Sequence, residues 1–356
     1  MRKASLQFLE ELVNTPSPSG REARGQRVWL DYVKQYADET SSDAYGNVVA
    51  TINKGSGPRL MIAAHADEIA MNLNYVDANG YLYVRKLGGI DAAITKAQRV
   101  TVHTRKGPVL GVVGNVAPHL SKVGGKREVP TISDLFIDIG VDSKKEAEKL
   151  VRIGDTITLN AQFEVLRGDK VVARAFDNRV GTFAVAETLR LLSANKSKLK
   201  CEVCFVSNTM EEIGCLGARQ IAYSLNPDVA LVVDVTHATD YPTVSKQIHG
   251  DIKIGKGPTL THGTNNHVEV VERLERLAKT KKIPLQHEAN SATSGTDTDV
   301  IFWTRGGIAS ALVSLPNRYM HSPVEVISLT DLGYIPELFA GFALSMKKGE
   351  EFKVRI

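Results

Sequence analysis

The sequence predicts an α/β protein, a three-layer α/β/α sandwich with an inserted, β-rich and barrel-like domain. Three patterns lead to this prediction. Two helix-like segments and then two strand-like segments occupy the first 70 residues, and strands and helices alternate from about residue 171. The run at residues 59–64 is apolar from Leu60 onward, which is typical of a central strand covered on both faces. Between about residues 72 and 162, short β-prone runs are punctuated by glycines and show little helical periodicity.

The N-terminal part begins with two predicted helices. Apolar residues from Leu6 to Val13 recur at helical spacing, and the first helix ends at the Pro- and Gly-rich turn of residues 15–20. A second amphipathic helix is expected at residues 21–36, and strands follow at residues 47–52 and 59–64. The second strand ends at His65-Ala66-Asp67-Glu68. Open α/β sheets bind their ligands beyond the carboxyl ends of the strands, so this position is a candidate site.

The predicted insert holds short strands at residues 81–84, 99–104, 109–113 and 156–159. We therefore divide the chain into a discontinuous sandwich domain, residues 1–70 and 164–356, and an insert, residues 71–163.

After the insert, the sequence returns to alternating helices and strands. Helices are predicted at residues 179–193, 216–224, 268–279 and 329–346. Strands are predicted at residues 201–207, 229–233 and 308–313. This order completes the layered sandwich.

Composition excludes several classes of partner. The 356 residues carry 44 Lys and Arg against 40 Asp and Glu, without an obvious basic block, so we expect no nucleic-acid partner. No run of 18 apolar residues occurs, so no transmembrane helix is expected. Glu10 and Glu11 interrupt the stretch that follows Met1-Arg2-Lys3, which argues against an export signal.

The three cysteines cannot pair completely, which is typical of a reducing compartment, and we expect a cytoplasmic protein. Cys201 and Cys204 form a CxxC pair that could be redox-active or zinc-binding. They lie in a strand pattern, however, where residues three apart point to opposite faces, so core packing is the better interpretation.

Polar residues that suit metal binding stand at the predicted strand ends. They are His65 and Asp67, Asp177 and Asn178, Glu211 and Glu212, Asp234, and His321. Two imidazoles with three or more carboxylates are enough to bind two divalent ions that share one ligand. Each cluster alone is weak, because an Asp at a strand end is more often a cap or turn residue. The other seven histidines are treated as ordinary surface or core residues.

The adjacent pair Glu211-Glu212 precedes a Gly-containing turn into a helix. Successive side chains project differently there, so one carboxylate could bind metal while the other carries a proton. The alternative is that both simply stabilise a helix N-terminus.

Taken together, the motifs closely resemble those of the tetrahedral (TET) aminopeptidases, co-catalytic metallopeptidases that include glutamyl and leucyl aminopeptidases. The resemblance runs from residue 17 to residue 325. The motifs, in order, are His65-Ala66-Asp67, Phe176-Asp177-Asn178, Glu211-Glu212-Ile213-Gly214, Val233-Asp234-Val235 and Met320-His321-Ser322-Pro323.

The resemblance implies a role for each candidate residue. Asp177 would bridge two divalent ions, zinc or cobalt with manganese as a further option. The metal ligands would be His65 and Asp234 on one ion, and Glu212 and His321 on the other. Glu211 would be the general base and acid, and Asp67 would orient His65 or polarise the site from behind it. The peptide bond after Asp177 is expected to be cis, and Asn178 replaces a second Asp that is not a ligand in the family.

The resemblance also implies short peptide substrates and a homo-oligomer in which dimers assemble into a dodecamer. The loop of residues 291–299 resembles the family's substrate-pocket loop, and a solvated turn is the equal alternative. Lys246, Lys256 and Arg318 could attract an acidic substrate side chain, although solvated surface is the default interpretation.

Two other functions stay open at this point. A glycosidase would need two carboxylates facing each other across roughly 5 to 9.5 Å, which the adjacent Glu211 and Glu212 cannot provide alone. A non-catalytic metal-binding scaffold with the same fold is the other alternative.

Overall fold

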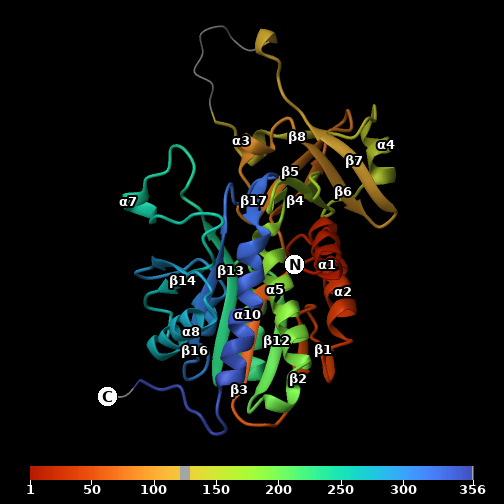
Figure 1. The fold of residues 1–356 in the computed structure, drawn as a ribbon. Coiled ribbons are helices and arrows are strands. Elements are labelled where there is room, and N and C mark those ends of the chain that lie inside the picture. Colours follow the sequence, from red (N-terminus) through yellow and green to blue (C-terminus); the bar gives the residue numbers. More distant parts are fainter. Residues whose placement is uncertain (121–128, 355) are drawn as a thin grey trace.

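An eight-stranded sheet forms the centre of the molecule (Figure 1). The structure is a computed structural model that describes residues 1–120, 129–354 and 356. From one edge to the other, the strands of the sheet are β1 (Glu39–Ser42), β2 (Val48–Ile52), β12 (Glu202–Asn208), β3 (Arg59–His65), β13 (Val229–His237), β16 (Ala309–Asn317), β14 (Thr259–His262) and β15 (Gln286–Ala289). The four strands from β12 to β16 run parallel, so their carboxyl ends meet at one edge of the sheet.

Helices cover both faces of this sheet, which confirms the predicted three-layer sandwich. One face packs against α1 (Lys3–Asn14), α2 (Ala23–Val33), α5 (Phe176–Ser193), α8 (Val268–Lys281) and α10 (Leu329–Ser345). The other face packs against α6 (Leu216–Leu225) and the short α9 (Thr298–Ile301). Figure 1 shows α5 and α10 side by side along the central strands.

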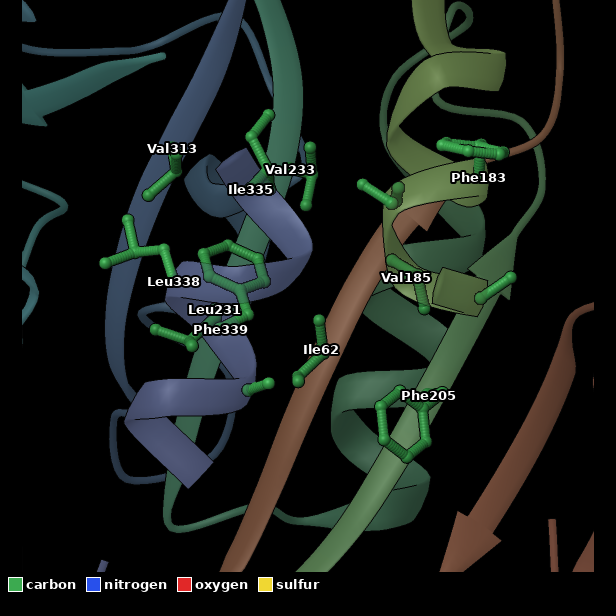
Figure 2. Packing of buried hydrophobic residues seen from close by; sticks show 14 of the residues in the cluster. Ile62, Phe183, Val185, Phe205, Leu231, Val233, Val313, Ile335, Leu338 and Phe339 are labelled. Atoms are coloured by element: carbon green, nitrogen blue, oxygen red, sulfur yellow. The ribbon is translucent and has the colours of Figure 1, made fainter. Parts of the chain in front are cut away.

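The side-chain alternation of the central strands explains the two layers of helices. In β3, Leu60 and Ile62 enter the core beneath α5 and α10, whereas Met61 and Ala63 enter the core beneath α6. Figure 2 shows Ile62, Leu231 and Phe339 in the first of these cores.

The same alternation separates the CxxC pair. Cys201 belongs to the core beneath α5 and α10, and Cys204 belongs to the core beneath α6. Both are buried free thiols, and burial raises the pKa of each to about 12. The interpretation of these cysteines as core residues is confirmed.

Six strands close into a barrel at one end of the molecule, beyond the ends of the long sheet strands (Figure 1). In barrel order they are β4 (Ala70–Val76), β5 (Leu82–Leu87), β8 (Phe136–Asp138), β7 (Gly107–Val113), β6 (Arg99–Thr104) and β9 (Thr156–Leu159). The barrel has its own hydrophobic core, which includes Met71, Val100 and Ile157. The predicted α/β fold with a barrel-like insert is therefore confirmed, while the boundaries at residues 71 and 163 stay a prediction.

A small third sheet contains β10 (Glu164–Arg167), β11 (Lys170–Ala173) and β17 (Glu325–Ser328). Strands β10 and β11 lie between β9 and α5 in the chain, whereas β17 comes from the C-terminal part. Three further short helices are α3 (Ala92–Thr95), α4 (Lys144–Leu150) and α7 (Lys246–His249). Within the described ranges, no helix has both the length and the apolar character needed to cross a membrane.

Candidate metal centre

The parallel strands bring the predicted site residues to one edge of the sheet. His65 is the last residue of β3, and it pairs in register with Asn208 at the end of β12. Glu211 and Glu212 lie three and four residues beyond the end of β12, Asp234 lies in the C-terminal half of β13, and His321 follows β16. Chain segments that are far apart in sequence thus meet where α/β sheets bind ligands.

Asp177 lies at the centre of these side chains and faces two histidines with its two oxygens. Oδ1 of Asp177 lies 3.3 Å from Nε2 of His65, and Oδ2 lies 3.2 Å from Nε2 of His321. Nε2 of His65 also lies 3.7 Å from Oδ1 of Asp234, and Nε2 of His321 lies 3.5 Å from Oε2 of Glu212. The five side chains therefore form two groups that share one carboxylate.

The start of α5 has an irregular backbone that presents Asp177 to both groups. Asp177 and Asn178 have non-helical dihedral angles, and the peptide bond between them is cis, as the resemblance implied. The side-chain amide of Asn178 donates to the carbonyl of Val233 in β13 (2.8 Å), and its oxygen accepts from the N–H of Gly181 (3.0 Å). Asn178 therefore anchors this turn to the sheet and does not act as a ligand.

Gly181 is required by the close packing of α5 on the sheet. A Cβ atom at this position would lie 2.2 Å from Oδ1 of Asn178 and 2.8 Å from the Cβ of Ala64. Any side chain would push α5 away from β3 and would carry Asp177 with it.

Asp67 braces the site from behind His65. Its Oδ1 lies 3.3 Å from Nδ1 of His65, and its carboxylate accepts hydrogen bonds from the hydroxyl of Ser19 (2.6 Å) and the backbone N–H groups of Glu211 (2.9 Å) and Glu212 (3.2 Å). Asp67 is fully buried and does not line the cavity described below. It can act on the reaction only through these neighbours.

Two residues of the site had no predicted role. The buried carboxylate of Glu325 accepts hydrogen bonds from the backbone N–H groups of Asp177 (2.9 Å) and His321 (3.1 Å), and so joins the two segments. Gly89, which follows β5 of the barrel, lies directly against the ring of His321. Glu325 could have been found from sequence as an acidic residue at the start of an apolar strand, but nothing in the sequence distinguishes Gly89 from other glycines.

The electrostatics of the site suit cations. Burial raises the pKa of Glu211 to about 9, and the carboxylates of Asp234, Asp297 and Asp177 add to this shift against the opposing effect of His65. Burial and the charge of Asp177 likewise raise the pKa of Glu212 well above its usual range. Crowded buried carboxylates are costly unless positive charge accompanies them.

The histidines and the shared carboxylate respond in the opposite direction. Burial alone would lower the pKa of His65, but the carboxylates of Glu211, Asp177, Asp234 and Asp67 raise it well above its usual range. Burial would raise the pKa of Asp177, but His321 and His65 lower it. Among the three carboxylates of the proposed ligands, Asp177 is the one whose pKa is lowered, so it is held in its charged form.

The donor set fits two divalent cations. Each group offers one imidazole nitrogen and carboxylate oxygens, which borderline metals such as zinc and cobalt accept. Oε1 of Glu212 is buried and has no hydrogen-bond partner among the described residues. Such an orphaned acceptor is explained when the carboxylate faces a cation.

The two groups open into a cavity of about 560 Å³. The loop of residues 291–299 contributes Ser294, Gly295, Thr296 and Asp299 to its wall. The Asp299 carboxylate accepts from the backbone N–H groups of Ser294 and Gly295 (2.8 Å each), which fixes the loop. The loop is therefore both a cavity wall and a hydrogen-bonded turn.

No lysine or arginine of the described chain lines this cavity. Arg318 instead makes two hydrogen bonds of 2.7 Å with the carboxylate of Asp240, and Lys246 pairs with Asp251 on the exposed α7 segment. None of the three basic candidates, Lys256 included, stands in the cavity wall.

Comparison with known proteins agrees with this geometry. The family model described as M42 glutamyl aminopeptidase matches residues 46–338. The lysyl aminopeptidase of Pyrococcus furiosus is 34% identical over 332 residues, which cover 92% of this chain and 93% of the relative.

Solved structures share the whole fold. A TET aminopeptidase from a marine sediment archaeon, Thaumarchaeota archaeon, superimposes with a TM-score of 0.92 at 30% identity, covering 97% of this chain and 98% of that one. The TET1 peptidase of Pyrococcus horikoshii, which can assemble into a tetrahedron or a large octahedral shell, gives a TM-score of 0.86 at 30% identity over 96% of this chain and all (100%) of that one.

A Thermotoga maritima protein named endoglucanase is also similar, with a TM-score of 0.76 at 25% identity over 94% of this chain and 96% of that one. Together with the match to the family model, the two TET structures confirm the resemblance to the TET aminopeptidases. The chain belongs to the M42 family of aminopeptidases, hydrolases that act on peptide bonds.

Proposed function

We propose that this aminopeptidase is metal-dependent and removes N-terminal residues from short peptides through a dinuclear centre. The observation that carries the proposal is the position of Asp177, whose two oxygens face the separate imidazoles of His65 and His321. A single carboxylate in this position can hold two cations at once.

In this proposal, Asp177 would be a ligand of both ions. His65 and Asp234 would complete one set of ligands, and Glu212 and His321 would complete the other. Two bound divalent cations, zinc, cobalt or manganese, would polarise the scissile carbonyl and make water nucleophilic near neutral pH. Glu325 and Asp67 would keep the ligand segments in place through their hydrogen bonds to the backbone.

Glu211 is assigned as the general base and acid. Its carboxylate lines the cavity, and its Oε2 lies 3.7 Å from Nε2 of His65. It would take a proton from the attacking water and later deliver it to the leaving amine. Burial raises the pKa of Glu211, and two adjacent cations would lower it again, which is the balance that a group exchanging a proton near neutral pH requires.

The substrate is expected to enter with its free N-terminal amine toward the acidic end of the cavity. Because the charged groups of the cavity wall, within the described chain, are carboxylates and histidines, we propose that neutral and basic N-terminal side chains are preferred over acidic ones. The similarity to a lysyl aminopeptidase supports this preference.

We further propose that the chain forms a homo-oligomer built from dimers, up to a dodecamer. The assembly of the similar TET1 peptidase supports this proposal, as do Leu110 and Val112, which are 69% and 48% exposed on β7 of the barrel. A cytoplasmic location is proposed from the three free thiols.

The test is a panel of fluorogenic aminoacyl substrates, assayed after chelation and again after adding zinc, cobalt or manganese. The proposal predicts no activity after chelation, recovery with metal, and no cleavage of substrates with a blocked α-amine. Lysyl and leucyl substrates should exceed the glutamyl substrate. Hydrolysis that survives complete chelation would contradict the proposal.

The glycosidase alternative is tested in the same preparation with a soluble cellulose derivative. A carboxylate-pair mechanism needs no metal, so chelation should leave that activity unchanged if it exists. Analytical ultracentrifugation tests the assembly, and a fully active monomer would refute it.

A further inference from the structure

Two histidines that the sequence left without a role come together on the sheet, away from the candidate metal centre. His262 ends β14, and His287 lies in the neighbouring edge strand β15. In this parallel pair, Leu260 is opposite His287 and His262 is opposite Ala289, so the two histidines are diagonal neighbours on one face.

Helix α8 supplies an acidic residue on the same face. Leu260 packs in the same core as Leu274 of α8, so this face of β14 lies under the helix. Glu275 follows Leu274, and it lies one helical turn beyond the buried Val271. Three separate elements therefore place His262, His287 and Glu275 together.

The three side chains point donor atoms at one another. Nε2 of His262 lies 2.9 Å from Nδ1 of His287, and Oε1 of Glu275 lies 3.8 Å from each of these nitrogens. The side chains of the two histidines and Glu275 are 42%, 51% and 39% exposed, so an ion can reach them from solvent.

We propose that His262, His287 and Glu275 form an accessory binding site for a borderline divalent cation such as zinc. With metal–ligand bonds of about 2.0 to 2.2 Å, neighbouring donors in a tetrahedral site are roughly 3.3 to 3.6 Å apart. The observed separations of 2.9, 3.8 and 3.8 Å lie on both sides of this range. Small rotations of half-exposed side chains would equalise them, and water would complete the coordination.

A simple hydrogen bond between the imidazoles explains less of this arrangement. It accounts for the 2.9 Å contact but not for a carboxylate oxygen at equal distance from both nitrogens. At 3.8 Å, this oxygen is too far away to accept a hydrogen bond from either ring. A cation among the three donors would give the carboxylate a partner as well as the imidazoles, once small rotations bring all three to ligand distance.

The chemistry of the donors selects the ion. Two imidazoles and one carboxylate suit zinc, copper, nickel or cobalt, whereas magnesium and calcium prefer oxygen ligands alone. A bound ion would connect the edge strand β15 to β14 and α8, and would stabilise this side of the sheet. The proposal shares no residue with the candidate metal centre and does not depend on the proposed function.

The experiment counts ions in untagged protein that is stripped by chelation, loaded with zinc and freed of excess metal. Wild type should bind one zinc ion per chain more than His287→Ala, and Glu275→Gln should bind the accessory ion at least tenfold more weakly. The matched control is His249→Ala, which removes an exposed histidine of α7 and should bind as much zinc as wild type.

A second measurement keeps folding effects apart. Zinc should raise the melting temperature of wild type and His249→Ala more than that of His287→Ala, and magnesium should not. Equal zinc stoichiometry in wild type and His287→Ala, with equal zinc-induced shifts in melting temperature, would overturn the proposal.

Discussion

Replacing Gly89 with alanine should disable the site by displacing one histidine. A Cβ atom at this position would lie 2.5 Å from Nδ1 and 2.6 Å from Cε1 of His321. Non-bonded carbon atoms prefer about 3.5 to 4.0 Å, so the ring or the Gly89 segment must move by roughly 1 Å. The backbone angles at Gly89 are open to alanine, since its φ lies outside the left-handed region. The clash with His321 is therefore the main effect of the substitution.

The expected loss follows from this displacement. A 1 Å misplacement at a catalytic centre can lower the rate by about 100-fold, which corresponds to roughly 2.7 kcal/mol of transition-state stabilisation. His321 is proposed to bind one of the two ions, so weaker metal binding should accompany the lower rate. The fold should persist, because the clash is confined to the end of the barrel that meets the site.

The assay is kcat/KM on an aminoacyl fluorogenic substrate at saturating metal, for wild type, Gly89→Ala and Gly306→Ala. A Cβ at Gly306 meets no atom within 4 Å, so this control should keep wild-type activity. If Gly89→Ala retained kcat/KM within threefold of wild type, the contact between the barrel and His321 would have no part in positioning the site.

Two further substitutions test roles assigned above, and a third concerns Glu22, a buried residue whose carboxylate accepts hydrogen bonds from the backbone N–H groups of Gly20 (2.6 Å) and Met210 (3.1 Å). Glu211→Gln should retain both ions but lose at least about 100-fold in kcat, and full turnover at wild-type metal content would remove Glu211 as the base. Asp67→Asn replaces one carboxylate oxygen with an NH₂ donor that faces the N–H of Glu211 or Glu212. Metal affinity or activity should therefore fall by about 10- to 100-fold. The control Ser19→Ala, which removes one hydrogen bond to Asp67, should cause a smaller loss. Burial, with the charge of Asp67, raises the pKa of Glu22 from 4.5 to about 7. The contribution of protonated Glu22 to the free energy of unfolding is therefore fully present below pH 4.5 and is lost as the pH rises through 7. Glu22→Gln should therefore increase the free energy of unfolding at pH 9 by up to about 3 kcal/mol, with a higher melting temperature, and should do so far less at pH 4. An equal effect at both pH values would contradict this reasoning.

The sequence predicts the long apolar strands of the central sheet well and the short or exposed strands poorly. The apolar runs at residues 59–64 and 229–233 became β3 and β13, because strands covered on both faces need apolar side chains throughout. Strands β10 and β15 were not predicted, since β10 is exposed along its length and β15 has alternating exposed positions, and both carry polar residues. Their strand geometry comes from pairing with a neighbour, which no local pattern reveals.

The clustering of the candidate site residues could be predicted because each lies at or near the end of a strand within a specific motif, while their roles stay a prediction. The structure brings the other four proposed ligands together around Asp177. The supporting residues could not be predicted in the same way. Glu325 acts through two backbone N–H groups, and Gly89 acts through the absence of a side chain, so each depends on segments that meet only in the folded chain.

The pairing of His262 with His287 illustrates the same limit. The two residues are 25 positions apart, and the short strands that carry them gave no clear signal. Only the parallel register of β14 and β15 makes them neighbours.

The most direct test is anomalous X-ray scattering at the zinc edge from crystals of the zinc-loaded protein. Two strong peaks should lie on either side of the Asp177 carboxylate, one beside His65 and Asp234 and the other beside Glu212 and His321. A single peak, or peaks that leave Asp177 without a contact to both ions, would show that this carboxylate is not the shared ligand.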